Sequence, residues 1–338
     1  MNPPPNVNPV NTAPLTQPFE IGGVRIANRV LLAPLAGIGN WFVRLQARRH
    51  GAGLAFSEMV SSFALHHGNE RTRVEMLRVH PDEHPLALQL FGSDPDVMRD
   101  AAETAAAAGP DLIDVNMGCP VPKVCKTGAG AALLDDPDRA VEVARAAGEG
   151  SGLPVTVKLR SGREPGERSG IDLAARLAEE AGVAAICLHP RSAATHHRGR
   201  ADYGLVRELA RRVSVPVIVS GGLRSAALAR RAYEESGADA VMIARGALGY
   251  PWIFAELARG RTRPPGPEEI VDELRWVLDQ AERHWAGRAS RNLRKFYPWY
   301  LERLGIAGPD ADAYQRTESL DEVRAMLSEL DREPAISG

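Results

Sequence analysis

Side chains that can do chemistry stand at the ends of short apolar runs in this sequence. They are Gln89 in LALQLFG, Asn116 and Cys119 in DVNMGC, Lys158 in VTVKLR and His189 in AICLHP. Amides, a thiol, a lysine and an imidazole can together bind a polar ring, balance its charge and move a proton. Burying each such group is costly unless it has a partner, so scattered core residues explain the set poorly. We therefore expect them to converge on one catalytic site.

The apolar runs themselves predict the fold. Strands that are apolar on both faces and alternate with helices form parallel βαβ units, and eight such units predict a closed (β/α)₈ TIM barrel. Intervening segments such as DPDVMRDAAETAAAAG and SGIDLAARLAEEAG have helical spacing and end in glycine, as helices often do. The eight runs are RVLLAP, LAFSEM, LALQLFG, LIDVNMG, VTVKLR, AICLHP, VPVIVSG and AVMIARG.

A barrel of this kind carries its active site at the C-terminal ends of the strands. The polar and small residues at these ends are therefore the candidates for catalysis and binding. They are Pro34, Ala36, Glu58, Gln89, the segment 116–119, Lys158, Arg160, His189, the segment 220–222 and the segment 244–246.

Two glycine-containing strand ends, VSGGLRS and IARGALG, predict a phosphate site, because barrels commonly hold phosphate after strands seven and eight. Arg245 could add a charge-assisted contact. With a phosphate there, Gln89, Asn116 and Lys158 suit a flat ring with amide and carbonyl edges, and FMN fits that description. Lys158 would stabilise the negative charge of the reduced ring. A structural ion pair inside the barrel is the alternative for Lys158, and an ordinary tight turn is the alternative for either glycine pair.

A Pro/Gly-rich break, RGRTRPPGP, ends the barrel pattern. Three helical stretches follow without further strands, EEIVDELRWVLDQAERHWAG, SRNLRKFYPWYLERLG and SLDEVRAMLSELDRE. We predict a disordered, proline-rich tail over residues 1–18, an FMN-binding barrel over 19–260 and a small helical domain over 261–338.

The helical domain contains a basic cluster. Between residues 283 and 303 the only acid is Glu302, whereas the basic residues are Arg283, Arg288, Arg291, Arg294, Lys295 and Arg303. Such a run is either a solvated helix face or a nucleic-acid-binding surface. Nearby aromatic residues could stack on bases, but at helical spacing they are more often core. These aromatic residues are Trp276, Trp285, Tyr297, Trp299 and Tyr300.

Composition excludes several classes of protein. No apolar run approaches the roughly 18 residues that a membrane helix needs, and the N-terminus lacks the pattern of a secretory signal. The three cysteines, Cys119, Cys125 and Cys187, are too few for a disulfide framework and match no zinc pattern, which favours a reducing cytoplasm and no metal. A net charge of −2 argues against nonspecific coating of nucleic acid.

The sequence resembles the dihydrouridine synthase family over nearly the whole chain after the N-terminal tail, with spacing closest to the bacterial B-type subgroup. The NMGCP segment with its downstream lysine is the most diagnostic. The motifs that carry the resemblance are LLAPLAGIGNWFVR, GAGLAFSEMV, LALQLFGSDP, DVNMGCPVPKV, VTVKLRSG, HPRSA with HHRGRADY, VMIARGALGYPWIF and RNLRKFYPWYL.

The resemblance implies a tRNA-dihydrouridine synthase in which NADPH reduces FMN, a hydride passes to uracil C6 and a cysteine protonates C5. By position the proton donor is Cys119, and a thiol is mostly protonated at neutral pH. A Cys119 thiolate nucleophile is the less favoured role, and Cys125 and Cys187 are interpreted as structural. The cofactor residues by resemblance are Pro34, Leu35, Ala36, Gln89, Asn116, Lys158, His189, Ser220, Gly221, Gly222, Ala244 and Arg245.

The resemblance further implies that the helical domain grips tRNA, because a uracil in folded RNA must be splayed out of its stack to reach the pocket. No obligate protein partner is evident. The residues expected to contact RNA are Arg160, Arg191, Arg288, Arg291, Arg294 and Lys295.

The sequence departs from the family pattern at three places. Ser220-Gly221-Gly222 stands where Asn-Gly-Asp is usual, Asn40 stands where Asp is usual, and HPRS replaces HGRT at residues 189–192. Three alternatives stay open: a barrel flavoenzyme of dihydroorotate or enoate type acting on a small molecule, dihydrouridine synthesis in rRNA, and a catalytically silent RNA-binding protein. The polar rim argues against the last, because RNA binding alone requires no such set.

Overall fold

The computed structural model describes residues 11–330. The chain forms two compact units. The first comprises the residues up to Gly246 together with Ile253–Gly260, and the second comprises Ala247–Trp252 together with the residues from Arg261 onward. The sequence pattern places one boundary near residue 260, whereas residues 247–252 cluster with the helical unit.

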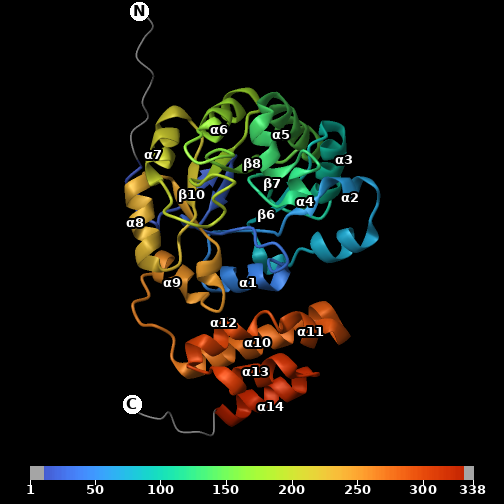
Figure 1. Cartoon of the computed structure of the whole chain (residues 1–338), viewed down its shortest axis with the longest axis vertical. Coiled ribbons are helices and arrows are strands. Elements are labelled where there is room, and N and C mark those ends of the chain that lie inside the picture. Colours follow the sequence, from blue (N-terminus) through green and yellow to red (C-terminus); the bar gives the residue numbers. More distant parts are fainter. Residues whose placement is uncertain (1–10, 331–338) are drawn as a thin grey trace, which may run out of the picture. The chain divides into compact units, whose positions relative to one another are not determined.

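The first unit is a closed barrel of eight parallel strands, which confirms the predicted fold (Figure 1). The ring closes where the last strand pairs with the first, with Val241 opposite Val30. A short additional strand, β5 (Val60–Ser61), pairs with β6. The barrel strands are β3 (Val30–Leu32), β4 (Leu54–Phe56), β6 (Leu86–Phe91), β7 (Leu112–Met117), β8 (Val155–Arg160), β9 (Ala185–His189), β10 (Val217–Ser220) and β11 (Ala240–Ile243).

A hairpin that the sequence pattern did not predict precedes the barrel. Strands β1 (Phe19–Ile21) and β2 (Val24–Ile26) pair in antiparallel fashion. Ile21 and Ile26 are fully buried against residues near the starts of the barrel strands. The hairpin therefore fills the N-terminal end of the barrel, and the C-terminal ends of the strands are left for the site.

Helices follow the strands and surround the barrel (Figure 1). Helix α3 begins with Asp94 as its cap and Pro95 in its first turn, as the DPD sequence favours. Glycines follow α3 and α6 with positive φ, as predicted for their C-terminal ends. The α-helices are α1 (Trp41–Arg49), α2 (Ser62–His66), α3 (Pro95–Ala106), α4 (Pro122–Cys125), α5 (Pro137–Ser151), α6 (Ser169–Glu180), α7 (Tyr203–Arg212), α8 (Ala226–Ser236) and α9 (Trp252–Ala258). Short 3-10 helices are η2 (Pro81–Glu83), η3 (Gly130–Asp135) and η4 (Arg245–Ala247), and η1 (Thr72–Met76) is a short π-helix.

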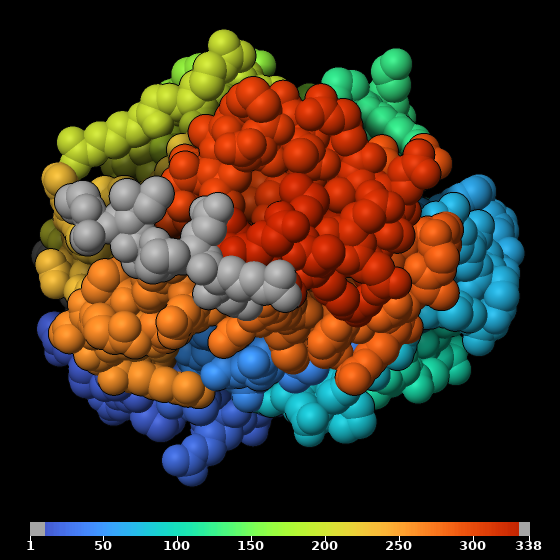
Figure 2. Space-filling view, turned by 90° about the horizontal axis from the view of Figure 1, so that it is seen from below, coloured from blue at the N-terminus to red at the C-terminus, as the bar shows by residue number. Residues whose placement is uncertain are grey.

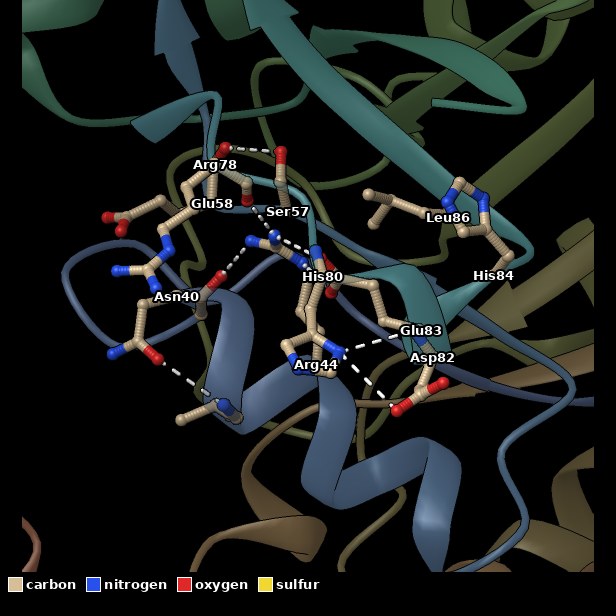
Figure 3. A network of polar contacts seen from close by, with 12 residues as sticks. Asn40, Arg44, Ser57, Glu58, Arg78, His80, Asp82, Glu83, His84 and Leu86 are labelled. Atoms are coloured by element: carbon tan, nitrogen blue, oxygen red, sulfur yellow. Dashed lines mark hydrogen bonds and ion pairs between the residues drawn. The ribbon is translucent and has the colours of Figure 1, made fainter. Parts of the chain in front are cut away.

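A buried ion pair anchors helix α1. Figure 3 shows the Arg44 guanidinium among the residues it holds: its Nε lies 2.7 Å from Glu83 Oε2, and its Nη atoms donate to the carbonyls of Gly39 (3.0 Å) and Arg78 (2.7 Å). Arg44 is 1% exposed and Glu83 is fully buried. Asn40 caps the same helix by accepting from the Val43 N–H. This network fixes the segment that leads from β3 into α1.

The second unit is helical, and its C-terminal part, red on the colour bar, forms one continuous body in Figure 2. The stretch 290–305, predicted as one helical segment, breaks into short helices, and Pro298 stands in the first turn of one of them. Helix α13 was not predicted. The elements are α10 (Pro267–Trp285), η5 (Ala286–Arg288), α11 (Ala289–Leu293), α12 (Tyr297–Leu301), η6 (Glu302–Leu304), α13 (Gly308–Arg316) and α14 (Leu320–Leu330).

The aromatic residues of this unit divide between core and surface. Tyr297 and Tyr300 are buried, whereas Trp276, Trp285 and Trp299 are half-buried. The interpretation of these tryptophans as core is therefore only partly right, since each keeps part of its ring exposed.

Part of the predicted disordered N-terminal tail is ordered. Residues 1–10 lie outside the described residues, and residues 11–18 are fixed to the barrel. The Asn11 amide donates to the Tyr233 hydroxyl and to the Ala238 carbonyl (both 2.9 Å), and Leu15 is buried. Disorder over the whole of 1–18 was wrong because polar partners on α8 and a buried leucine hold its second half. Within residues 11–330 no helix is long and apolar enough to span a membrane.

Candidate active site

A cavity of about 300 Å³ lies at the C-terminal ends of the barrel strands. Most of the residues predicted from strand ends line it together. Leu35, Arg191 and Glu58 do not: Leu35 is buried, and Glu58 accepts from the Gly37 N–H instead. The predicted residues that line the cavity are Pro34, Ala36, Gln89, Asn116, Gly118, Cys119, Lys158, Arg160, His189, Ser220, Gly221, Gly222, Ala244, Arg245 and Gly246.

The lining carries positive charge without a compensating carboxylate. Lys158, Arg160, Arg224 and Arg245 line the cavity, and none of the described lining residues is Asp or Glu. Burial, followed by the charge of Lys158, holds the pKa of His189 well below its ordinary value. The lysine and the arginines therefore supply the positive charge at neutral pH, and the cavity suits an anionic ligand.

A chain of buried amides runs between strands β6 and β7. The Gln89 Nε2 donates to Asp114 Oδ2 (2.6 Å), and the Gln89 Oε1 accepts from the Asn116 Nδ2 (2.9 Å). Thr156 donates its hydroxyl to the other Asp114 oxygen (2.5 Å). The register explains the contacts, because Gln89 lies opposite Asp114 and Asp114 lies opposite Thr156.

The loop after β7 holds the Cys119 backbone on both sides. The Asn116 Oδ1 accepts from the N–H groups of Gly118 (3.2 Å) and Cys119 (2.9 Å). Arg160 Nε donates to the Gly118 carbonyl (2.8 Å), and the Ala131 N–H donates to the Cys119 carbonyl (2.9 Å). All four backbone polar atoms of residues 118 and 119 therefore have partners. Of the polar groups of these two residues, only the Cys119 thiol can take part in a reaction.

The Cys119 thiol is half-buried and lines the cavity. Burial raises its pKa above the ordinary value, opposed by the Val121 N–H and by Arg160 and Lys158. The thiol is therefore protonated at neutral pH, which suits an acid rather than a thiolate nucleophile. Cys125, half-buried, and Cys187, buried, are also free thiols.

The glycines after β10 form a cradle that side chains would fill. Gly221 has φ of +99°, and a Cβ there would lie 2.4 Å from the His189 ring. Gly222 has φ of +83°, and a Cβ there would lie 3.0 Å from the Tyr203 hydroxyl, which donates to the Gly221 carbonyl (3.0 Å). Backbone N–H groups can approach a ligand closely at such positions.

Two arginines predicted to contact RNA fasten the 192–199 loop. Arg160 Nη1 donates to the carbonyls of Ser192 (3.0 Å) and His196 (2.8 Å), and Arg191 Nη2 donates to the Gly199 carbonyl (2.8 Å). Arg191 Nη1 lies 3.2 Å from His189 Nε2. Arg191 Nε is buried and has no hydrogen-bond partner among the described residues.

Sequence reasoning missed several lining residues. His196 and His197 belong to the HHRGRADY motif, which could have pointed to them as site residues. Arg224 lies two residues after the predicted glycine pair and could have been found in the same way. Met242 gave no signal, because its strand β11 is apolar throughout, and Met59 lies in the segment between β4 and β5. The missed lining residues are Met59, Pro120, Val121, His196, His197, Leu223, Arg224 and Met242.

The basic cluster of the second unit is not uniform. Arg288, Arg291 and Lys295 are exposed, whereas Arg294 donates to the Thr317 carbonyl (3.1 Å). Lys295 Nζ also lies 5.8 Å from the centre of the Trp285 ring. Arg294 therefore holds the Thr317 carbonyl in addition to carrying charge.

Barrel and cavity define the chain as a TIM-barrel enzyme with its site at the C-terminal ends of the strands. Among the described residues, no group of three or more His, Cys, Asp or Glu side chains is placed to hold a metal ion. The fold is similar to morphinone reductase (TM-score 0.54, 18% identity, covering 78% of this chain and 94% of that one). It is also similar to a 2-naphthoyl-CoA reductase (TM-score 0.57, 13% identity, 73% and 52%).

Sequence comparison gives the family. The profile of the dihydrouridine synthase (Dus) family matches residues 31–332. The chain is 36% identical to tRNA-dihydrouridine synthase B of Pseudomonas aeruginosa over 310 residues, 89% of this chain and 92% of that protein. It is 38% identical to tRNA-dihydrouridine synthase B of Klebsiella pneumoniae over 306 residues, 88% and 93%. The chain belongs to the dihydrouridine synthase family, and the predicted resemblance is confirmed.

Proposed function

We propose that this enzyme reduces uridine to 5,6-dihydrouridine in tRNA, with FMN as the cofactor, NADPH as the reductant and Cys119 as the proton donor. The observation that carries the proposal is the Cys119 thiol itself. It lines a cationic cavity, the backbone polar atoms of Gly118 and Cys119 all have partners, and burial keeps the thiol protonated. The names of the relatives support tRNA as the substrate.

The cavity residues fit FMN. The glycine cradle after β10, together with Arg245 and Arg224, offers N–H groups and charge to a phosphate. Gln89 and Lys158 offer an amide and a cation to the ring. No carboxylate among the described lining residues opposes the charge of a phosphate or of a reduced ring. When bound, reduced FMN would supply the hydride that goes to C6 of uracil.

The chain's own residues deliver the proton and hold the substrate. The Cys119 thiol gives its proton to C5 of uracil, and Arg160 and Lys158 stabilise the thiolate that this leaves behind, since both charges act on Cys119. His189 is neutral at neutral pH and serves as a hydrogen-bonding group rather than as an acid. Solvent re-protonates Cys119 before the next turnover.

The second unit would hold the RNA outside the cavity. Arg288, Arg291 and Lys295 are exposed cations that can contact phosphates, and the half-exposed Trp285 beside Lys295 offers a ring for stacking. A small-molecule flavoenzyme would need none of these. The similar fold of the two reductases supports a small-molecule substrate as the alternative function. The following experiment distinguishes tRNA reduction from that alternative.

The test is mass spectrometry of nucleosides from tRNA and rRNA of cells with and without the protein. Loss of dihydrouridine at a defined tRNA position supports the proposal. Loss in rRNA alone would change the substrate, and no change in either RNA would favour a small-molecule substrate. With purified protein, Cys119→Ala should keep its flavin and still oxidise NADPH while losing most dihydrouridine formation; near-normal product would remove Cys119 from the mechanism. Cys125→Ser is the matched control: its hydroxyl can keep the contact that the Cys125 thiol makes with the Cys119 carbonyl (3.4 Å), and it should remain active.

A further inference from the structure

Asp114 is a fully buried carboxyl in strand β7 that the proposed reaction does not use. It lies opposite Gln89 on β6 and opposite Thr156 on β8, and each of its oxygens accepts one short hydrogen bond from one of them. Burying a carboxyl is costly even with partners. A core position that needed only packing would be filled better by an apolar residue, so the acceptor itself requires an explanation.

The orientation of two amides follows from this acceptor. In the ionised form both Asp114 oxygens accept, and in the neutral acid the proton can lie on Oδ1, where the Thr156 hydroxyl can accept it. In both forms Oδ2 accepts, so Gln89 presents its NH₂ group to Asp114 (2.6 Å). The Gln89 oxygen then faces Asn116, which must present its own NH₂ group (2.9 Å). The Asn116 oxygen is thereby left for the backbone N–H groups of Gly118 and Cys119. The hydrogen bonds from the Cys119 loop through Asn116 and Gln89 to Asp114 therefore all have the same donor-to-acceptor direction.

We propose that Asp114 is a positioning residue for Cys119, acting through the orientation of the Gln89 and Asn116 amides. The inference rests on the proposed function, in which an aligned Cys119 thiol delivers the proton. Without an acceptor at position 114 the Gln89 amide can turn over and present its NH₂ group to Asn116. If Asn116 turns as well, its NH₂ group faces the N–H of Cys119, and two donors oppose each other. Either way the loop loses its fixed position.

Three variants separate this role from packing. Asp114→Ala removes the acceptor. Asp114→Asn restores it, because its amide oxygen can face Gln89 while its NH₂ group faces the Thr156 hydroxyl, which can accept. Thr156→Val is the matched control: it is equally buried, lies in the same layer and removes the other hydrogen bond to Asp114, but leaves the bond to Gln89 intact.

The first measurement needs no RNA. The flavin-loaded variants are treated with iodoacetamide, and the modification of each cysteine is followed by peptide mass spectrometry. Cys119 should react several-fold faster in Asp114→Ala than in the natural protein, whereas Asp114→Asn and Thr156→Val should match the natural protein. Buried Cys187 should stay unmodified, which reports an intact barrel. If Cys187 reacts in the alanine variant, Asp114→Leu fills the space without an acceptor and should give the same faster modification of Cys119.

The second measurement separates the two half-reactions. In Asp114→Ala, uridine reduction in tRNA should fall about 10- to 100-fold, the cost of misplacing a catalytic group by about an ångström. Flavin reduction by NADPH should fall much less, because Lys158 and the glycine cradle still line the cavity and Cys119 takes no part in that half-reaction. Equal losses in Asp114→Ala and Thr156→Val would overturn the proposal in favour of packing. Natural Cys119 reactivity in Asp114→Ala would overturn it directly. If the natural protein forms no dihydrouridine, the proposed function fails, and the alkylation pattern still decides the role of Asp114.

Discussion

The α-carbon of Gly221 faces the ring of His189 so closely that a Cβ on it would lie 2.4 Å from His189 Cδ2. The two residues come from neighbouring strand ends, and their contact forms one wall of the cavity. The glycine is therefore required by close approach as well as by its positive φ.

Gly221→Ala should displace His189 and lower flavin retention at least tenfold, because strain and a clash of backbone with ring act together. Gly166→Ala is the control, since Gly166 has a similar φ of +87° but open space around it. That variant should lose only about 1–2 kcal/mol of stability and keep its flavin. The flavin content of the purified variants, read from their absorption spectra, decides the matter. Full flavin occupancy in Gly221→Ala would contradict the proposal that the glycines after β10 bind the cofactor.

The buried pair of Arg44 and Glu83 should dominate the stability of the segment around helix α1. Glu83→Gln leaves the Arg44 guanidinium buried without its counter-charge and should cost about 3–5 kcal/mol of the free energy of unfolding. Arg176→Ala breaks an exposed pair with Glu180 of similar length and should hardly change the melting temperature. Denaturant unfolding of both variants tests the contrast, and comparable losses would refute it.

Asp114 should make stability depend on pH in an unusual direction. Burial raises its pKa from 3.8 to about 7, opposed by its hydrogen bonds and by Lys158. The folded chain therefore binds more protons than the unfolded chain between these pH values, so this group's contribution to stability falls as pH rises through the window and levels off above it. Relative to Asp114→Asn, the natural protein should lose melting temperature between about pH 4 and about pH 7. A difference that stays constant with pH would contradict the shift.

The exposed basic residues of the second unit should control RNA affinity through salt. Replacing Arg288, Arg291 and Lys295 with alanine should weaken tRNA binding and reduce the salt slope by about one per lost phosphate contact. Arg294 is left in place because it holds the Thr317 carbonyl. Arg316→Ala removes an exposed charge elsewhere in the unit and serves as the control for each single replacement. An unchanged salt slope in the triple variant would show that the basic cluster is a solvated helix face and does not bind RNA.

The amino-acid pattern by itself determined the barrel and most of its rim. A strand buried on both faces must be apolar throughout, so its end is visible where polar residues begin, and parallel strands bring those ends to one side. For that reason Gln89, Asn116, Lys158 and His189 could be predicted together before any contact was known, and they do line one cavity. Cys119 emerged from the NMGCP motif.

Only the tertiary structure decided which side chains meet. Asp114 lies inside an apolar strand, so the sequence alone gives no role for it. The strand register places it opposite Gln89 and Thr156, and this identifies its hydrogen-bond partners. Arg44 and Glu83 are 39 residues apart, so no local spacing relates them. Periodicity reports which face of an element is buried, whereas partners across elements depend on register and packing, which are properties of the whole fold.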